Sequence, residues 1–148
     1  MRYPDVRGDL VVFTHAGDLW SVPASGGVAR RLTFHEGEER YPKISPDGRL
    51  IAFSAEYDGN TDVYVMNTDG GHVTRVTYHP AADEVLGWHP TRNRILFRSA
   101  RATLGRTQRL YLIAPDGSGL EELPLPQAGW GAFSPDGRQI AYTRVTTE

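Results

Sequence analysis

A segment of about 45 residues recurs along this chain of 148 residues, and this recurrence constrains the fold more than any other feature. Its clearest copies are ISPDGRLIAF at 44–53, WHPTRNRILF at 88–97 and FSPDGRQIAY at 133–142. The first residues of these copies lie 44 and 45 positions apart. A shortened copy, VRGDLVVF, occupies 6–13. A period of this length is typical of repeat architectures, in which each unit buries its apolar surface against its neighbours.

Each period contains four short β-like runs separated by turn signals. In the second period we expect strands at 41–45, 49–55, 62–67 and 73–77. Between the first two strands lies Pro-Asp-Gly, in which proline sets φ for a turn and Asp-Gly tolerates the positive φ of a tight hairpin. Asp58-Gly59-Asn60 and Asp69-Gly70-Gly71 supply the next two turns. Each unit is therefore predicted to be a four-stranded antiparallel meander.

Four-stranded units at this spacing indicate an all-β fold, a β-propeller made of four-stranded antiparallel blades. The second and third strands are apolar on both faces, as in LIAF and VYVM, so both faces must be covered by neighbouring blades. A two-sheet sandwich is the alternative that the regular period disfavours. We expect one partial propeller over 1–148, with blades at about 1–38, 39–82 and 83–127 and the first two strands of a fourth blade at 128–148.

Three and a half blades would leave an open apolar blade face at each end. Propellers typically close with 4–8 blades, and exposed apolar faces of that size are rare on monomers. We therefore expect the chain to be part of a longer protein whose remaining blades close the ring. The alternative is that copies of the chain associate with one another.

The composition excludes several classes of protein. The chain has no cysteine, which excludes disulfides, thiolate nucleophiles and cysteine-based zinc sites. Its net charge of −2 gives no electrostatic reason to bind nucleic acid or an anionic membrane. No stretch approaches the roughly 20 apolar residues of a membrane span, and the N-terminus lacks the apolar region of a signal peptide. We expect no cofactor, no nucleic-acid or membrane partner, and a cytoplasmic location; the location would be periplasmic if a leader has been removed.

Two patterns that suggest catalysis or metal binding are weak. HEGEER at 35–40 is similar to the zinc motif HExxH, but Arg40 stands where the second histidine would lie, and the segment is a Gly-containing link rather than a helix. No serine lies in a G-x-S-x-G elbow. Ser45 and Ser134 occupy equivalent turn positions in two repeats, which favours a structural role. We expect no catalytic residue and no metal site in this chain.

Arginines gather in the third repeat, where the loop at 100–107 is longer than its counterparts. Longer loops on one face of a propeller often form binding surfaces. Guanidinium groups there could hold a peptide carboxylate or an acidic partner. The alternative is a solvated hairpin whose arginines form salt bridges with acidic stretches. The candidate contact residues are Arg92, Arg94, Arg98, Arg101, Arg106 and Arg109.

Two further expectations concern individual side chains. Large aromatic residues recur at matched positions of the repeats, as core residues do: Trp20, Trp88, Trp130, Tyr64 and Tyr111. In the third repeat the usual Asp-Gly turn is replaced by Thr-Arg-Asn at 91–93, so we expect Asn93 to adopt positive φ there.

The ordered series of motifs resembles the N-terminal propeller of tricorn-type proteases, which is built of WD40-like (PD40) repeats. The resemblance is carried by YPDVRGDLVVF, DLWSVPASGGVARRLT, YPKISPDGRLIAF and DVYVMNTDGG, and by RVTYHPAADEVLGWHP followed by ILFRS. The last of these covers a whole junction between blades. The SPDG turn alone is less specific, because TolB-like and prolyl-oligopeptidase-type propellers are similar there.

The resemblance implies a six-bladed propeller followed by further domains and a serine-peptidase core, whose nucleophile and histidine lie beyond the length present here. It also implies that the propeller is a gated passage for peptides. We therefore expect a non-catalytic segment that gates or guides peptide substrates toward a protease core elsewhere. The alternative is a TolB-like protein-interaction propeller without enzymatic activity.

Overall fold

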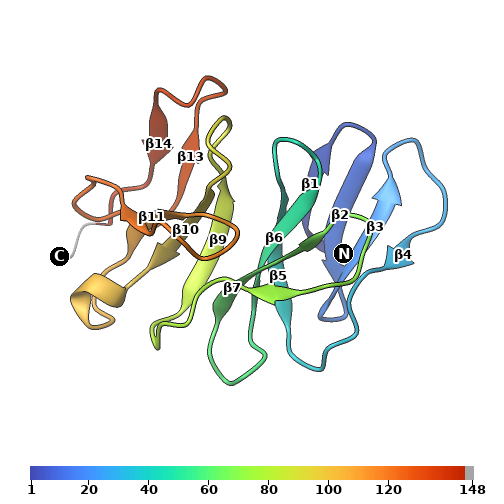
Figure 1. The fold of residues 1–148 in the computed structure, drawn as a ribbon, viewed down its shortest axis with the longest axis horizontal. Helices are drawn as coiled ribbons and strands as arrows, with labels where there is room; N and C mark the ends of the chain where they lie inside the picture. The colour runs from blue at the N-terminus through green and yellow to red at the C-terminus, as the bar shows by residue number, and fades with distance from the viewer. Residues whose placement is uncertain (146–148) are drawn as a thin grey trace.

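The computed structural model describes residues 1–145, which form four antiparallel β-sheets one after another along the chain (Figure 1). Three sheets have four strands each and the last has two. In every sheet the strands lie side by side in chain order, as in a meander. This architecture confirms the predicted all-β propeller with three complete blades and the first two strands of a fourth.

The strands are short, and the fourth strand of each complete sheet is the shortest. The first sheet contains β1 (Arg2–Arg7), β2 (Leu10–His15), β3 (Asp18–Pro23) and β4 (Arg30–Arg31). The second contains β5 (Glu39–Ile44), β6 (Leu50–Ala55), β7 (Asp62–Asn67) and β8 (Thr74–Arg75). The third contains β9 (Asp83–Trp88), β10 (Ile95–Ser99), β11 (Arg109–Ile113) and β12 (Glu121–Glu122), with the 3₁₀ turn η1 (Arg101–Thr103) between β10 and β11. The fourth contains β13 (Gly131–Phe133) and β14 (Ile140–Tyr142).

The core lies between the sheets. In the first cluster, Val12 and Leu19 pack against Phe53, which joins the first two sheets. Two further clusters join the second sheet to the third and the third to the fourth, so both faces of the middle sheets are covered, as the apolar strands predict. Because burying one large apolar side chain stabilises a fold by about 1.5–3 kcal/mol, each sheet depends on its neighbours.

A buried carboxylate joins the first sheet to the second. Glu39, at the start of β5, is 0% exposed. It accepts hydrogen bonds from the Leu19 amide at 3.0 Å and from the hydroxyls of Thr33 and Tyr57. Thr33 Oγ1 also accepts a hydrogen bond from the Leu19 amide at 2.9 Å. The Leu19 amide thus has a threonine side chain as its acceptor where a strand neighbour would offer a backbone carbonyl.

The outer edge of each of the first two sheets repeats one polar arrangement. Arg31 pairs with Asp18 at 2.6 Å, and Arg75 pairs with Asp62 at 2.6 Å. Thr77 Oγ1 accepts from the Val63 amide at 2.9 Å, as Thr33 does from Leu19 in the first sheet. This side-chain bond explains why β8 ends at Arg75 although a strand to residue 77 was expected.

The first strands of successive sheets, β1, β5, β9 and β13, contact one another in order. β1 and β5 each contain a register shift, between Arg2 and Asp5 and between Arg40 and Lys43. Tyr3 lies within the first shift and Tyr41 within the second, at φ of 51° and 55°. Positive φ is uncommon for bulky residues, so the two bulges fix these tyrosines in an unusual conformation.

The expectations for individual side chains are met in part. Asn93 adopts φ of 47°, which confirms its predicted role in the third repeat. Tyr64 and Tyr111 are buried, and their rings stack on Phe53 and Phe97 at centroid distances of 5.9 and 5.5 Å.

The tryptophans depart from the expected core role. Trp20 and Trp88 are half-buried, and the prediction for Trp130 is wrong, since it is 45% exposed. Trp130 precedes β13, and its ring contacts Tyr41 and Arg98 instead of entering the cluster between the third and fourth sheets.

Candidate functional site

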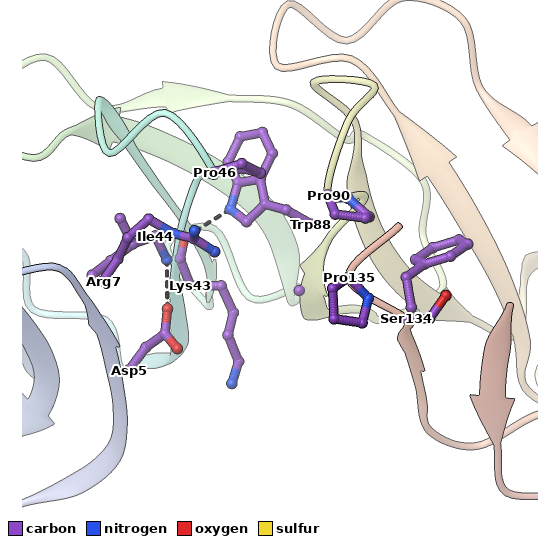
Figure 2. A pocket seen from close by; sticks show the side chains of 11 residues that line it. Asp5, Arg7, Lys43, Ile44, Pro46, Trp88, Pro90, Ser134 and Pro135 are labelled. Atoms are coloured by element: carbon purple, nitrogen blue, oxygen red, sulfur yellow. Dashed lines mark hydrogen bonds between the residues drawn. The ribbon is translucent and has the colours of Figure 1, made fainter. Parts of the chain in front are cut away.

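A cavity of about 570 Å³ opens where the first strands of all four sheets end (Figure 2). Each sheet contributes residues to its wall. The lining residues are Asp5, Arg7, Lys43, Ile44, Pro46, Gly87, Trp88, Pro90, Phe133, Ser134 and Pro135. Because β1, β5, β9 and β13 are the strands that adjoin one another around the axis, this cavity is the axial pocket of the described blades.

Turns that are equivalent in the repeats form one side of the axial pocket. Pro46, Pro90 and Pro135 occupy the same position in three repeats and all line it. Proline rings give this side a rigid apolar surface, because φ is fixed and the backbone nitrogen carries no proton. Gly87 also lines the pocket, and a Cβ built there would meet no atom within 4 Å, so this glycine opens onto the cavity.

The serines of these turns have structural hydrogen bonds. Ser45 donates to Asp47 at 2.6 Å and accepts from the Leu50 amide at 3.0 Å. Ser134 donates to Asp136 at 2.6 Å in the same way. The hydrogen bond from Ser45 lowers the pKa of Asp47, and that from Ser134 lowers the pKa of Asp136. A hydroxyl that donates to a charged carboxylate in a turn holds the turn closed, and neither serine has a histidine as its hydrogen-bond acceptor.

Charged side chains also line the axial pocket. The Asp5 carboxylate accepts a hydrogen bond from the Ile44 amide at 2.8 Å, and the indole of Trp88 donates to the Lys43 carbonyl at 2.8 Å. These bonds connect the innermost strands of the first three sheets, and Figure 2 shows both. The side chains of Asp5 and Lys43 extend to the same side of these strands (Figure 2). The pocket therefore presents one carboxylate and two cations, Arg7 and Lys43, beside apolar rings.

The structure does not bring the six candidate arginines into one group. Arg92 and Arg94 precede β10 and contact β12 and the turn before it: Arg92 pairs with Glu121 at 3.0 Å, and Arg94 donates to the Ser118 carbonyl at 3.2 Å. Arg109 pairs with Glu122 at 2.7 Å on the neighbouring strand. All three guanidinium groups therefore have partners at the outer edge of the third sheet.

Arg98 and Arg101 contact the inner edge of the third sheet. Arg98 pairs with Glu84, donates to the Gly129 carbonyl at 3.1 Å and lies over the Trp130 ring at 4.4 Å. Arg101 pairs at 2.6 Å with Asp83, whose carboxyl is 0% exposed. Burial raises the pKa of Asp83, while hydrogen bonding and the charge of Arg101 act in the opposite direction. In contrast to these arginines, the side chain of Arg106 is exposed in the loop after η1.

The histidines contribute to loops and packing. His35 lies at a ring-centroid distance of 3.9 Å from Tyr57, and its Nδ1 accepts from the Gly37 amide at 3.0 Å. His89 lies beside Phe133 at 4.6 Å, and burial lowers its pKa. Within residues 1–145, no group of three or more His, Cys, Asp or Glu side chains could hold a metal ion. No helix in the same range is both long and apolar enough to span a membrane.

The axial pocket was not predicted from the sequence, although a signal for it was present. Tyr-Pro precedes a charged residue twice, as Tyr3-Pro4-Asp5 and as Tyr41-Pro42-Lys43. These triplets lie at the register shifts that turn Asp5 and Lys43 toward the pocket. A repeated charge at the matched position of an innermost strand is the pattern that could have predicted them.

Comparison with known proteins agrees with this geometry. The family model of the tricorn protease N-terminal β-propeller domain matches residues 1–148. The tricorn protease homolog 1 of Streptomyces coelicolor is 36% identical over 89 residues, which cover 60% of this chain and 8% of that protein. The chain spans at most half of the length of the first curated relatives that it matches.

Solved structures share the fold. The crystal structure of the tricorn protease matches with a TM-score of 0.79 at 24% identity, over 90% of this chain and 14% of that chain. TolB from Acinetobacter baumannii matches with a TM-score of 0.74 at 23% identity, over 90% of this chain and 34% of that chain.

Proposed function

Since the chain belongs to the family of tricorn protease N-terminal β-propeller domains, we propose that it guides peptide substrates toward a protease core that lies outside these 148 residues. The chain itself would carry no catalytic step. The whole protein would be a serine peptidase, and this segment would gate or line the passage through which peptides reach it. Its partners would be peptides and either the remainder of its own longer chain or further copies of this chain.

The axial pocket is the observation that carries this proposal. Its wall comes from all four sheets, so a peptide in the pocket would lie on the axis of the blades and not at one edge. Arg7, Lys43 and Asp5 offer charged groups to the polar backbone and termini of a peptide, and the three prolines offer rigid apolar contacts. Such a mixed lining suits extended peptides of varied sequence, which is what a passage must accept.

A binding experiment on the 148-residue chain tests the proposal. The indole N–H of Trp88 lies in the pocket wall and gives an NMR resonance that Trp88→Phe would assign. We expect decapeptides of mixed sequence to shift this resonance and to remain uncleaved. Lys43→Met should weaken binding about threefold to tenfold, since a tenfold change corresponds to about 1.4 kcal/mol. The Trp88 hydrogen bond goes to the carbonyl of Lys43, so this substitution leaves it in place.

Arg144→Gln is the matched control, because Arg144 is exposed and does not line the axial pocket. Its peptide affinity should equal that of the wild type. An unchanged Trp88 resonance at millimolar peptide would overturn the proposal. Peptide hydrolysis that disappears when a serine of this chain is replaced would also overturn it.

A second candidate function is a protein-interaction propeller without enzymatic activity. The TolB fold likeness favours it, and the exposed Arg106 would then be a contact for an acidic partner. The two candidates differ in ligand and in compartment. Peptide passage predicts that short peptides bind on the axis and that the protein is cytoplasmic. The alternative predicts that Arg106→Glu abolishes binding of a folded partner while peptides fail to bind, and that cell fractionation recovers the protein from the periplasm.

A further inference from the structure

Three aromatic rings from three sheets meet at the innermost strands. The rings of Tyr3 and Tyr41 lie 4.5 Å apart, and those of Tyr41 and Trp130 lie 5.8 Å apart in an edge-to-face arrangement. Tyr41 belongs to the second sheet, whereas Trp130 lies at the start of the fourth. The third sheet separates these two in chain order, so their contact joins blades that are not consecutive along the chain. We name Tyr3, Tyr41 and Trp130 the aromatic triad.

Two members of the aromatic triad have strained backbone, and the third is open to solvent. Tyr3 and Tyr41 adopt positive φ at the bulges of β1 and β5. Bulky residues keep this conformation only where the surrounding structure enforces it, and such positions cluster at binding and active sites. Trp130 is 45% exposed, so part of its ring remains accessible. Both observations indicate a binding surface more than a packed core.

Arg98 shows which chemical group this surface accepts. Its guanidinium lies 4.4 Å from the centre of the Trp130 ring and pairs with the Glu84 carboxylate. Burial raises the pKa of Tyr41, and the negative charge of Glu84 raises it further, whereas the positive charge of Arg98 lowers it. Aromatic faces attract cations, and a nearby carboxylate strengthens this preference.

We propose that the aromatic triad, together with Glu84, binds a guanidinium or ammonium group of a peptide, and that Arg98 occupies this place when no ligand is present. The biological ligand rests on the proposed passage for peptides. The cationic group of the peptide would compete with Arg98 for the Trp130 face and for Glu84. The triad would thereby give the passage a preference for arginine side chains, lysine side chains or a free N-terminus.

The experiment compares two ligands that differ only in charge. N-acetyl-arginine amide and N-acetyl-citrulline amide are titrated into the 148-residue chain, and the indole N–H resonance of Trp130, assigned with Trp130→Phe, is followed by NMR. We expect the arginine derivative to bind at least about threefold more tightly, because the cation–aromatic contribution at a partly exposed site is modest. Equal affinity would mean stacking without charge recognition and would overturn the proposal.

Variants of the site make the test sharper. Arg98→Gln should tighten binding of the arginine derivative severalfold, because the internal competitor is gone, whereas a structural role alone predicts weaker binding or none. Tyr41→Leu keeps the Trp130 reporter and should abolish binding, because Tyr41 contacts both other rings of the triad. Tyr3→Leu provides a second loss variant if Tyr41→Leu fails to fold. Arg92→Gln is the control, because Arg92 pairs with Glu121 away from the triad. Unchanged binding in Tyr41→Leu or in Arg98→Gln would contradict the proposal.

This experiment separates the two proposals. If neutral peptides shift the Trp88 resonance but the Trp130 resonance shows no preference for charge, the passage stands and the aromatic triad is not a cation site. If the arginine derivative shifts Trp130 and no peptide shifts Trp88, the triad is a site but the proposed peptide passage fails.

Discussion

Glu39 shows how one buried side chain links two sheets. Burial raises its pKa above that of an unfolded glutamate, although the hydrogen bonds from Thr33 and Tyr57 lower it. A carboxyl with a raised pKa in the folded state binds its proton more tightly there than in the unfolded state. The free energy of unfolding therefore falls as the pH rises from the unfolded-state pKa to the folded-state pKa, and it stays lowered above that.

We predict that Glu39→Gln removes this pH dependence. Glutamine keeps the shape and an acceptor oxygen but carries no charge, so the stability of the variant relative to the wild type should increase as the pH rises from about 4 to 8. Each unit of pKa shift corresponds to about 1.4 kcal/mol. Urea denaturation at a series of pH values measures the difference. Glu36→Gln, at an exposed position of the same link, is the control and should give a curve parallel to that of the wild type. A difference for Glu39→Gln that stays constant with pH would refute this account.

At the scale of the element, the repeat pattern predicted the sheets well and their ends less well. Apolar runs bounded by turn residues such as Asp-Gly indicate where most hairpins turn, and β7 at Asp62–Asn67 has its expected bounds. β8 is shorter than expected because the side chain of Thr77 replaces a backbone partner. The loop at 100–107 is not open to a ligand along its whole length, because Arg101 in η1 pairs with Asp83 on β9.

The candidate site was harder to predict than the fold for a physical reason. Period-two alternation assigns side chains to the two faces of a regular strand. The register shifts at Tyr3 and Tyr41 break that alternation and decide which side chains line the axial pocket. Trp130 was misassigned because it is not equivalent to Trp88: the repeat copies start at Trp88 and Phe133, and Trp130 lies three residues before the second of these, just ahead of β13.

The turn at 91–93 in the third repeat allows a prediction about a single hairpin to be tested. Asn93 takes the positive φ that glycine takes in the equivalent turns, at Gly48 and Gly137. We predict that Asn93→Val lowers the free energy of unfolding by about 1–2 kcal/mol, because a branched side chain in this region clashes with the backbone. Asn93→Gly should stay within about 0.5 kcal/mol of the wild type, since glycine adopts the conformation freely. Urea denaturation compares the two, and equal destabilisation by valine and glycine would show that the backbone conformation does not matter.

At the scale of the whole molecule, the fourth sheet has one covered face and one open face. Phe133 and Ile140 pack onto the third sheet. Their neighbours Ala132 and Ala141 therefore point to the opposite face, and both are exposed. Within residues 1–145, this sheet contains only β13 and β14, so the outer edge of β14 keeps its backbone groups available to another strand.

We predict that the 148-residue chain self-associates through this face. Light scattering should give a mass above 16.4 kDa that rises with protein concentration. Ala141→Lys should shift the distribution toward the monomer, because it places a charge on the open face. Leu104→Lys is the matched control at an exposed apolar residue in the loop after η1, and it should leave the mass unchanged. A clean monomer of the wild type at every concentration would contradict the prediction.

The hydrogen bonds between the sheets also affect the order in which the blades can fold during synthesis. The carboxylate of Glu39 reaches back 6 residues to Thr33 and 20 to Leu19. The bonds between innermost strands bridge 39 residues from Ile44 to Asp5 and 45 from Trp88 to Lys43. Each of these hydrogen bonds joins newly synthesised chain to the same blade or to the blade that left the ribosome just before it. Blades can therefore fold one after another during translation, without waiting for distant segments.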